Sequence, residues 1–244
     1  MVRRVRALLV LTTLWSCATH SHQMAPVTVH LVPHSHDDPG YRQTYMGYYR
    51  HAVHDIISTM VEALWEDPSR RFIQVEVSFF SLWWSNQTAD TRSKVLSLVS
   101  EGRLEFVGGG WVMHDEMVTT IDAMANQMTL GLQWLKQELG VRPRHAWQID
   151  PFGHSWTSCN LFQQLGFDSV VINRVPDDEK QRMKETRELQ FIWEGNLASD
   201  GDTSGIFVHV LDSHYNTPSP KNATPSERAD FLLHQVDRRL EWYL

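Results

Sequence analysis

Strand-like and helix-like segments alternate along most of this 244-residue chain. The strand candidates are short runs rich in β-branched and aromatic residues. They fall at 27–32, 72–77, 104–107, 145–149, 169–172, 190–193 and 205–210. Apolar residues at helical spacing predict helices at 44–65, 90–101, 121–139, 157–165 and 226–243. This alternation is typical of βαβ units, so the sequence predicts one α/β domain with a largely parallel sheet.

Composition narrows the kind of ligand that such a domain binds. Acidic side chains outnumber basic ones, 29 to 22, which gives a formal net charge of −7. A nucleic-acid-binding protein needs a basic surface to neutralise phosphates, so this balance argues against one. The ten Trp and thirteen His are unusual. Because Trp provides a stacking surface and His is the commonest metal ligand, the composition favours a ligand-handling protein.

The N-terminus has the parts of a secretory signal peptide. Residues 1–18 combine a basic start, a short apolar run and small residues near the end. We therefore expect a domain at 19–244 in the secretory pathway, either lysosomal or secreted. No other apolar run reaches the roughly 18 residues that a spanning helix needs, so we expect no stable membrane insertion. Sequons at Asn86 and Asn222 are candidate glycosylation sites. The oligomeric state is left open.

A dense polar cluster follows the first strand candidate. His36 and Asp38 are separated by one residue, and in extended backbone such residues point the same way. An imidazole nitrogen and a carboxylate oxygen can then reach one metal ion together. His34 and Asp37 are candidates for orienting these ligands. A polar turn before Pro-Gly is the simpler interpretation of the same residues.

Two further clusters follow strand candidates. Asp150 stands directly after 145–149 and is followed by Pro and Gly, so it can be a metal ligand, a nucleophile or both. An Asp-Pro turn is the commoner use of such a residue. Phe152 and Trp147 can stack on a sugar face, although aromatic residues are more often part of the core. The third cluster, 108–116, holds three glycines and His-Asp-Glu and is a weak signal by itself.

Five strings give the chain a resemblance to glycoside hydrolase family 38, the class II α-mannosidases, nearest the lysosomal or epididymal type. They are VPHSHDDPGY at 32–41, FFSLWW at 79–84, EGRLEFVGGGWVMHDE at 101–116, QMTLGLQWL at 127–135 and WQIDPFGHS at 147–155. The resemblance implies a mainly parallel β/α barrel of about seven strands, of which this chain carries the N-terminal portion. The barrel is therefore expected to be incomplete here.

The resemblance also implies roles for individual residues. His36, Asp38 and Asp150 match zinc ligands, with one zinc per chain, and Asp150 also matches the nucleophile. Four residues match positions that contact the sugar or the nucleophile: Tyr41, Phe152, Arg174 and Tyr215. Tyr41 stands where the family usually has Trp, so it keeps an aromatic face but loses area.

The implied activity is retaining, zinc-dependent hydrolysis of terminal α-mannosyl residues from mannose-containing glycans. The family's last zinc ligand and its acid/base aspartate match nothing in this chain, so we expect the chain alone to be inactive and poorly stable. The alternative is an inactive truncated isoform or pseudoenzyme with residual mannose binding. A metal-dependent deacetylase on a similar barrel is a third interpretation, and the strings at 79–84 and 147–155 argue against it.

Overall fold

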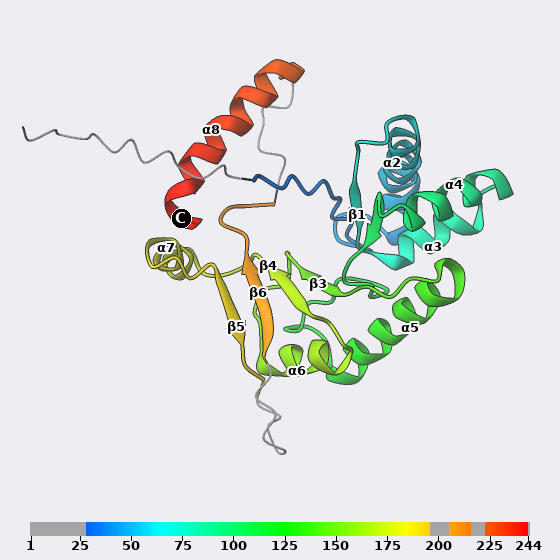
Figure 1. Cartoon of the computed structure of the whole chain (residues 1–244). Helices are drawn as coiled ribbons and strands as arrows, with labels where there is room; N and C mark the ends of the chain where they lie inside the picture. The colour runs from blue at the N-terminus through cyan, green and yellow to red at the C-terminus, as the bar shows by residue number, and fades with distance from the viewer. Residues whose placement is uncertain (1–27, 196–204, 216–222, 244) are drawn as a thin grey trace, which may run out of the picture. The chain divides into compact units, whose positions relative to one another are not determined.

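The computed structural model describes residues 28–195, 205–215 and 223–243 of the chain. The chain divides into two compact units, residues 1–30 and 31–244. Residues 28–30, the described part of the first unit, form no helix or strand. The second unit carries these elements (Figure 1): α1 (Tyr45–Tyr48), the π-helix η1 (Tyr49–Val53), α2 (His54–Glu66), β1 (Phe72–Gln74), α3 (Val77–Ser85), α4 (Ala89–Ser100), β2 (Leu104–Phe106), α5 (Ile121–Leu139), β3 (His145–Gln148), α6 (Trp156–Gln164), β4 (Ser169–Ile172), α7 (Asp177–Glu185), β5 (Gln190–Trp193), β6 (Ile206–Val210) and α8 (Pro225–Tyr243).

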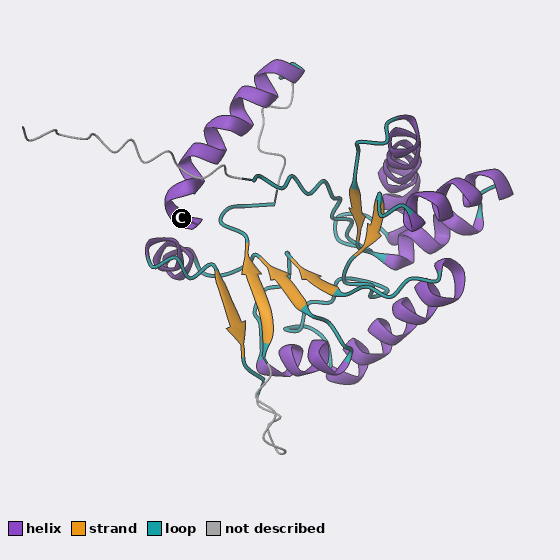
Figure 2. Cartoon of the chain, viewed as in Figure 1, coloured by secondary structure: helices purple, strands orange, loops and turns teal. Residues whose placement is uncertain are grey.

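The described strands form two sheets. β1 and β2 pair in parallel, and the second sheet has the order β3-β4-β6-β5. Its first three strands run parallel, whereas β5 runs antiparallel to β6 at the edge, as the arrowheads in Figure 2 show. The amide of Gly108, just after β2, donates to the carbonyl of His145 in β3 at 2.8 Å and so links the two sheets. The prediction of a largely parallel α/β sheet is confirmed.

The closed barrel of about seven strands is not confirmed, because the described residues form six strands in two sheets. The strand predicted at 27–32 is wrong over the described residues 28–32, which have no strand assignment. A single bridge pairs His34 with Ile73, and the Ile73 amide donates to Pro33 at 3.0 Å. Pro33 has no N–H to extend such a ladder, and Leu31 and Val32 are exposed.

The helix α3 differs from the sequence-based expectation of a strand up to Val77. Both sides of this helix are buried, because Val77, Phe79, Phe80 and Trp83 are all excluded from solvent. A continuous apolar run fits a buried helix as well as a buried strand, so periodicity alone did not distinguish them. Helix α7 was not predicted either. It is polar apart from buried Met183, with acids in its first turn and bases in its last.

Helix α5 lies at the predicted residues 121–139 because both of its ends have strong local signals. The Thr120 hydroxyl accepts a hydrogen bond from the Ala123 amide at the first turn. At the other end Gly140 has a φ of 70°, the left-handed conformation that favours glycine. The helix packs against α3, and Leu135 and Leu139 join the core that α2, α3 and α4 build.

Two larger cores and one small cluster stabilise the second unit. One core packs α2, α3 and α4 against β1 and β2, and the other packs α6 and α7 against β4 and β6. The small cluster contains Val75, Val107, Trp147 and Ile149, each at or just beyond a strand end. It therefore supports the edge of the sheets where the parallel strands finish. None of the described helices combines the length and apolar character needed to cross a membrane.

Gly131 provides a test of how tightly α5 packs on the loop after β2. A Cβ at this position would meet the Gly109 carbonyl oxygen and would lie 2.6 Å from the Gly110 carbonyl carbon. Backbone atoms cannot move aside cheaply, so Gly131→Ala should lower the free energy of unfolding by about 2 kcal/mol or more. This reverses the usual gain from replacing a mid-helix glycine by alanine.

Gly140→Ala is the matched control, because a Cβ there meets nothing within 4 Å and only the left-handed backbone is strained. Gly140→Ala should lower the free energy of unfolding by about 1 kcal/mol. Urea unfolding of both variants measures the difference. A Gly131→Ala protein as stable as the wild type would contradict the close approach of helix and loop.

Candidate active site

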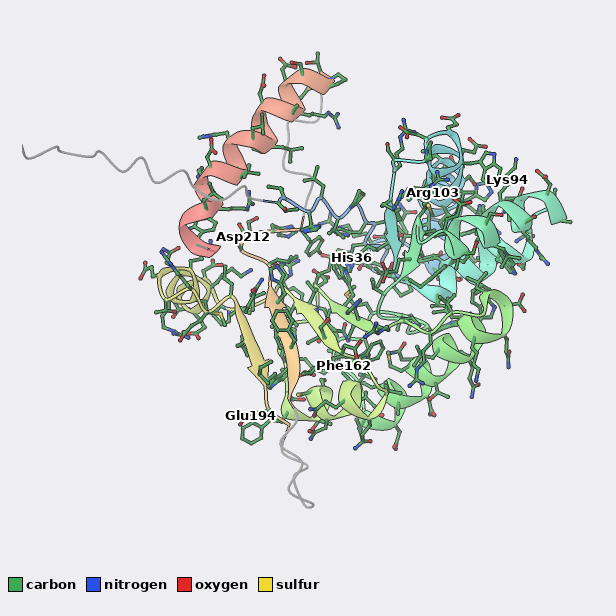
Figure 3. All side chains as sticks on the ribbon, viewed as in Figure 1. His36, Lys94, Arg103, Phe162, Glu194 and Asp212 are labelled. Carbon is green, nitrogen blue, oxygen red and sulfur yellow. The ribbon has the colours of Figure 1, made fainter. Side chains whose placement is uncertain are left out.

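The candidate site lies where the parallel strands end. Glu76, Asp150 and Arg174 each follow the last residue of their strand by two positions, after β1, β3 and β4. The last residues of β3 and β4 are partners in the ladder, so their ends meet at one edge. Residues two apart in extended backbone face the same side, which directs these side chains together. His36 lies at this end of the molecule, toward which the arrowheads of β4 and β6 point (Figure 3).

His36, Asp38 and Asp150 form a group that can hold a metal ion. One ligand atom from each lies within 4.8 Å of the others. His36 Nε2 is 3.1 Å from Asp38 Oδ1 and 3.4 Å from Asp150 Oδ2. The same nitrogen is buried and makes no well-formed hydrogen bond. One imidazole and two carboxylates are a donor set that suits zinc, so the residues present fit the ion that the sequence implied.

The other oxygen of Asp150 is held by two side chains. Arg174 donates to Asp150 Oδ1 through Nε at 3.0 Å and Nη2 at 2.5 Å, and the Tyr215 hydroxyl donates to it at 2.6 Å. Partial burial by itself would raise the pKa of Asp150, but the hydrogen bonds from Tyr215 and Arg174 outweigh it and lower the pKa below its ordinary value. The carboxylate is thus ionised and fixed in orientation.

A cavity of about 820 Å³ opens in front of this carboxylate. Two aromatic side chains on its wall are exposed, Tyr41 by 72% and Phe152 by 57%. The Arg174 guanidinium lies 4.9 Å from the centre of the Phe152 ring. Exposed rings beside a polar cavity can stack on the apolar face of a sugar. Trp147, by contrast, is buried against His34, so the suggestion that it stacks on a sugar is wrong.

His114 is the centre of a buried network beside the cavity. The Val112 amide donates to Gln127 Oε1, so the Gln127 amide nitrogen donates to His114 Nδ1 at 2.8 Å. Neutral His114 must then carry its proton on Nε2, which faces the Gln148 amide. The Gln148 amide nitrogen lies 3.3 Å from this His114 nitrogen, so turning that amide over would bring its oxygen, which has no partner among the described residues, to the proton. Glu116 accepts from the Ser155 amide and the Ser158 hydroxyl and so caps α6.

Glu76 is a residue that the sequence reasoning missed. Its side chain is fully excluded from solvent, and one oxygen lies 3.7 Å from His36 Nδ1. Burial raises the pKa of Glu76 well above its ordinary value, and the negative charge of Asp37 adds to this effect. No sequence signal was available, because the predicted strand at 72–77 contained Glu76, and only the observed end of β1 at Gln74 gives it the same position as Asp150 after β3. Of the two orienting candidates, Asp37 is buried, and His34 packs on Trp147.

The predicted modification and targeting segments stay predictions. Asn86 is exposed at the end of α3, where its amide donates to the Leu82 carbonyl at 2.8 Å. Thr88 of the same sequon caps α4. Asn222 and the expected signal peptide at 1–18 lie outside the described residues.

Comparison with known proteins gives matches over most of the chain. A family model described as the glycosyl hydrolases family 38 N-terminal domain matches residues 26–244. The lysosomal alpha-mannosidase of Cavia porcellus is 42% identical over 206 residues, which are 80% of this chain and 20% of that protein. Alpha-mannosidase D of Dictyostelium discoideum is 41% identical over 218 residues, 89% of this chain and 17% of that protein. The chain thus spans about a fifth of the length of these relatives.

Solved structures share the fold at lower sequence identity. An alpha-mannosidase from Enterococcus faecalis V583 superposes with a TM-score of 0.69 and 16% identity, covering 87% of this chain and 23% of that chain. A 4-alpha-glucanotransferase from Thermococcus litoralis gives a TM-score of 0.55 with 15% identity, covering 74% of this chain and 26% of that chain. At these identities the two structures support the fold alone.

The buried His114 predicts a pH dependence of stability. Burial lowers the pKa of His114 below 6.5, and the nearby acids Glu116 and Asp115 offset this only in part. As the pH falls below 6.5, the unfolded chain takes up a proton that the folded protein resists, so His114 destabilises the fold progressively until its folded pKa is passed. Asparagine can keep the acceptor for Gln127 without titrating. His114→Asn should therefore gain stability relative to the wild type as the pH falls.

Urea unfolding of both proteins between about pH 7.5 and 5.5 measures this difference, because other buried histidines contribute equally to the two curves. Parallel stability curves over this range would mean that His114 has the same pKa in the folded and the unfolded protein, which would contradict the effect of its burial.

Proposed function

The chain belongs to glycosyl hydrolase family 38, and we propose that it carries the nucleophile and most of the zinc site of a retaining α-mannosidase. The substrate is a mannose-containing oligosaccharide, from which terminal α-mannosyl residues are hydrolysed. The observation that carries this proposal is the Asp150 carboxylate, which faces His36 through one oxygen and Arg174 and Tyr215 through the other. Such a carboxylate can serve both a metal ion and a reacting sugar.

The names of the relatives support the reaction and the compartment. Proteins named lysosomal alpha-mannosidase align with 80% or more of this chain in Cavia porcellus and Homo sapiens. We therefore propose a protein of the secretory pathway, lysosomal or secreted, in agreement with the signal peptide expected at 1–18. The proposal concerns the enzyme of which these residues form a part, since they span about a fifth of those relatives.

His36, Asp38 and Asp150 would hold one zinc ion. When bound, zinc supplies positive charge that polarises the oxygens it contacts and can orient sugar hydroxyls. His36 Nε2 is free of a competing hydrogen bond, and one oxygen of each carboxylate already faces it. Asp38 is more exposed than His36, which leaves the ligand group open toward the cavity.

Asp150 would act as the nucleophile. One of its oxygens forms an ester with the anomeric carbon while the bond to the leaving oxygen breaks, and a second carboxylic acid gives that oxygen its proton. Water then cleaves the ester, and the configuration at the anomeric carbon is retained. Arg174 and Tyr215 keep the attacking carboxylate ionised and fix its orientation through their hydrogen bonds. Tyr41 and Phe152, exposed on the cavity wall, provide the stacking surface for the sugar.

Zinc content tests the ligand assignment. His36→Ala, Asp38→Ala and Asp150→Ala should each lower the zinc bound per chain, because each removes one donor from a small set. Asp115→Ala is the matched control, since Asp115 lines the same cavity but is outside the ligand group, and its zinc content should be unchanged. Elemental analysis after dialysis against limiting zinc measures the effect. Undiminished zinc in all three ligand variants would refute the site.

Covalent trapping tests the nucleophile. A fluorinated mannosyl reagent should label the peptide that contains Asp150 in the full enzyme, because the glycosyl ester forms but breaks down slowly. Asp150→Asn keeps the size of the side chain and should abolish both the label and the hydrolysis of an aryl α-mannoside. A label on another carboxylate would remove this role from Asp150. Binding of mannose with no turnover in the full protein would favour the pseudoenzyme alternative, and activity on an acetylated sugar would favour a deacetylase.

A further inference from the structure

The turn between β4 and α7 carries Arg174, the side chain that holds one oxygen of Asp150. Asn173 follows the last residue of β4 and is buried, with 2% of its surface exposed. Its carbonyl accepts a hydrogen bond from the Val175 amide at 2.9 Å. A carbonyl bonded to the amide two residues further on closes a three-residue turn, and Arg174 is the middle residue of that turn. The position of the Arg174 side chain therefore depends on the Asn173 carbonyl.

Lys180, in the first turn of α7, binds that same carbonyl. Its ammonium donates to the Asn173 carbonyl oxygen at 2.6 Å and to the Asn173 side-chain oxygen at 3.0 Å. A carbonyl oxygen has two lone pairs and an ammonium has three donors, so the carbonyl can accept from Lys180 and from the Val175 amide together. The lysine thus reaches back to the end of β4 and holds a single residue there by two oxygens.

The charge of Lys180 is costly where it lies. The side chain is half-buried, and this burial lowers the pKa of Lys180 below its ordinary value. Asp177 and Asp212 favour the charge from nearby, yet the hydrogen bonds of the ammonium go to the neutral oxygens of Asn173. Helix α7 already has an anchor in the core, the buried Met183. Attachment of the helix therefore does not by itself account for the lysine.

We propose that Lys180 is a positioning residue that fixes the turn around Arg174 and so holds the guanidinium against Asp150. Arg174 donates to one oxygen of Asp150 from Nε at 3.0 Å and from Nη2 at 2.5 Å. Two bonds to one atom require a particular placement of a long side chain, and a fixed backbone reduces the entropy lost in that placement. The part of this inference that concerns catalysis rests on the proposed function. The placement of Arg174 is a property of the chain by itself.

The place of Lys180 beside the active-site cavity indicates which step it affects. It does not line that cavity but a neighbouring one of about 750 Å³, and Arg174 and Phe152 line both. The lysine therefore acts on Asp150 through Arg174 rather than on the sugar. A reacting group displaced by about 1 Å can lose about 100-fold in rate. Loss of the lysine should thus slow the reaction of the bound sugar and leave its binding largely unchanged.

Lys180→Met tests the proposal, because it removes the ammonium and keeps much of the length of the side chain. In the full enzyme, assayed with added zinc, kcat on an aryl α-mannoside should fall about 10- to 100-fold while KM changes little. Lys184→Met is the matched control. Lys184 belongs to the same helix and lines the same cavity, but its ammonium lies 4.5 Å from the centre of the Trp242 ring. This variant should leave both constants unchanged.

The placement of Arg174 is measured directly in the 244-residue chain. The NMR signal of its Nε–H, assigned through its loss in Arg174→Lys, should be protected from exchange with water because this group is bonded to Asp150. Lys180→Met should speed the exchange about 10-fold or more, and Lys184→Met should not. Thermal melting establishes that each variant is folded. If Lys180→Met does not fold, Lys180→Gln keeps a donor for one of the two oxygens and should show a smaller change of the same kind.

A wild-type Arg174 whose Nε–H exchanges as fast as that of an exposed arginine overturns the proposal even if no variant folds. So does a Lys184→Met protein with the same losses as Lys180→Met. An active enzyme whose kcat is unchanged in Lys180→Met refutes the role of Lys180 and leaves the proposed function intact. If the full enzyme hydrolyses no α-mannoside while Lys180→Met still speeds the exchange at Arg174, the proposed function fails and the positioning of Arg174 by Lys180 stands.

Discussion

The Asp150 carboxylate is the contact on which the rest of the site depends. It brings together the loop that holds His36, the end of β4 with Arg174, and the segment after β6 with Tyr215. These residues are far apart in the chain, and Tyr215 is 65 positions from Asp150. Charge-assisted hydrogen bonds are stronger than neutral ones, especially away from bulk water. These hydrogen bonds to Asp150 can form only if the strands end at one edge, so the site depends directly on the parallel sheet.

This edge of the sheets carries more acid than base. Asp37, Asp38, Glu76 and Asp150 lie within the same region, whereas Arg174 is the base paired with Asp150. Like charges this close destabilise the fold, and burial of Asp37 and Glu76 raises the pKa of both. A bound divalent cation would offset that repulsion. The acidic character of this edge is therefore compatible with the metal ion proposed for the site.

Much of the secondary structure could be predicted where local signals act alone. Helix α5 has a threonine cap and a terminal glycine, and β4 and β5 lie at the predicted residues. The predictions failed where contacts between segments distant in the sequence decide whether a segment forms a strand or a helix. The first predicted strand is reduced to a single bridge because Pro33 cannot continue the ladder. The continuous apolar run of α3 fits a buried strand as well as a buried helix, so its local sequence did not decide between them. The direction of β5 depends on β6, which local sequence does not specify.

The sequence by itself determined which residues are candidates for the proposed chemistry. His36 and Asp38 at a spacing of two, and Asp150 directly after a strand, were identified from residue type and position, because extended backbone repeats every two residues. Only the tertiary structure decided which of them meet and what surrounds them. It left Tyr41 exposed and buried Trp147, it joined Arg174 and Tyr215 to one oxygen of Asp150, and it placed a buried Glu76 beside His36. Burial and distance depend on contacts between remote segments, and no local pattern encodes them.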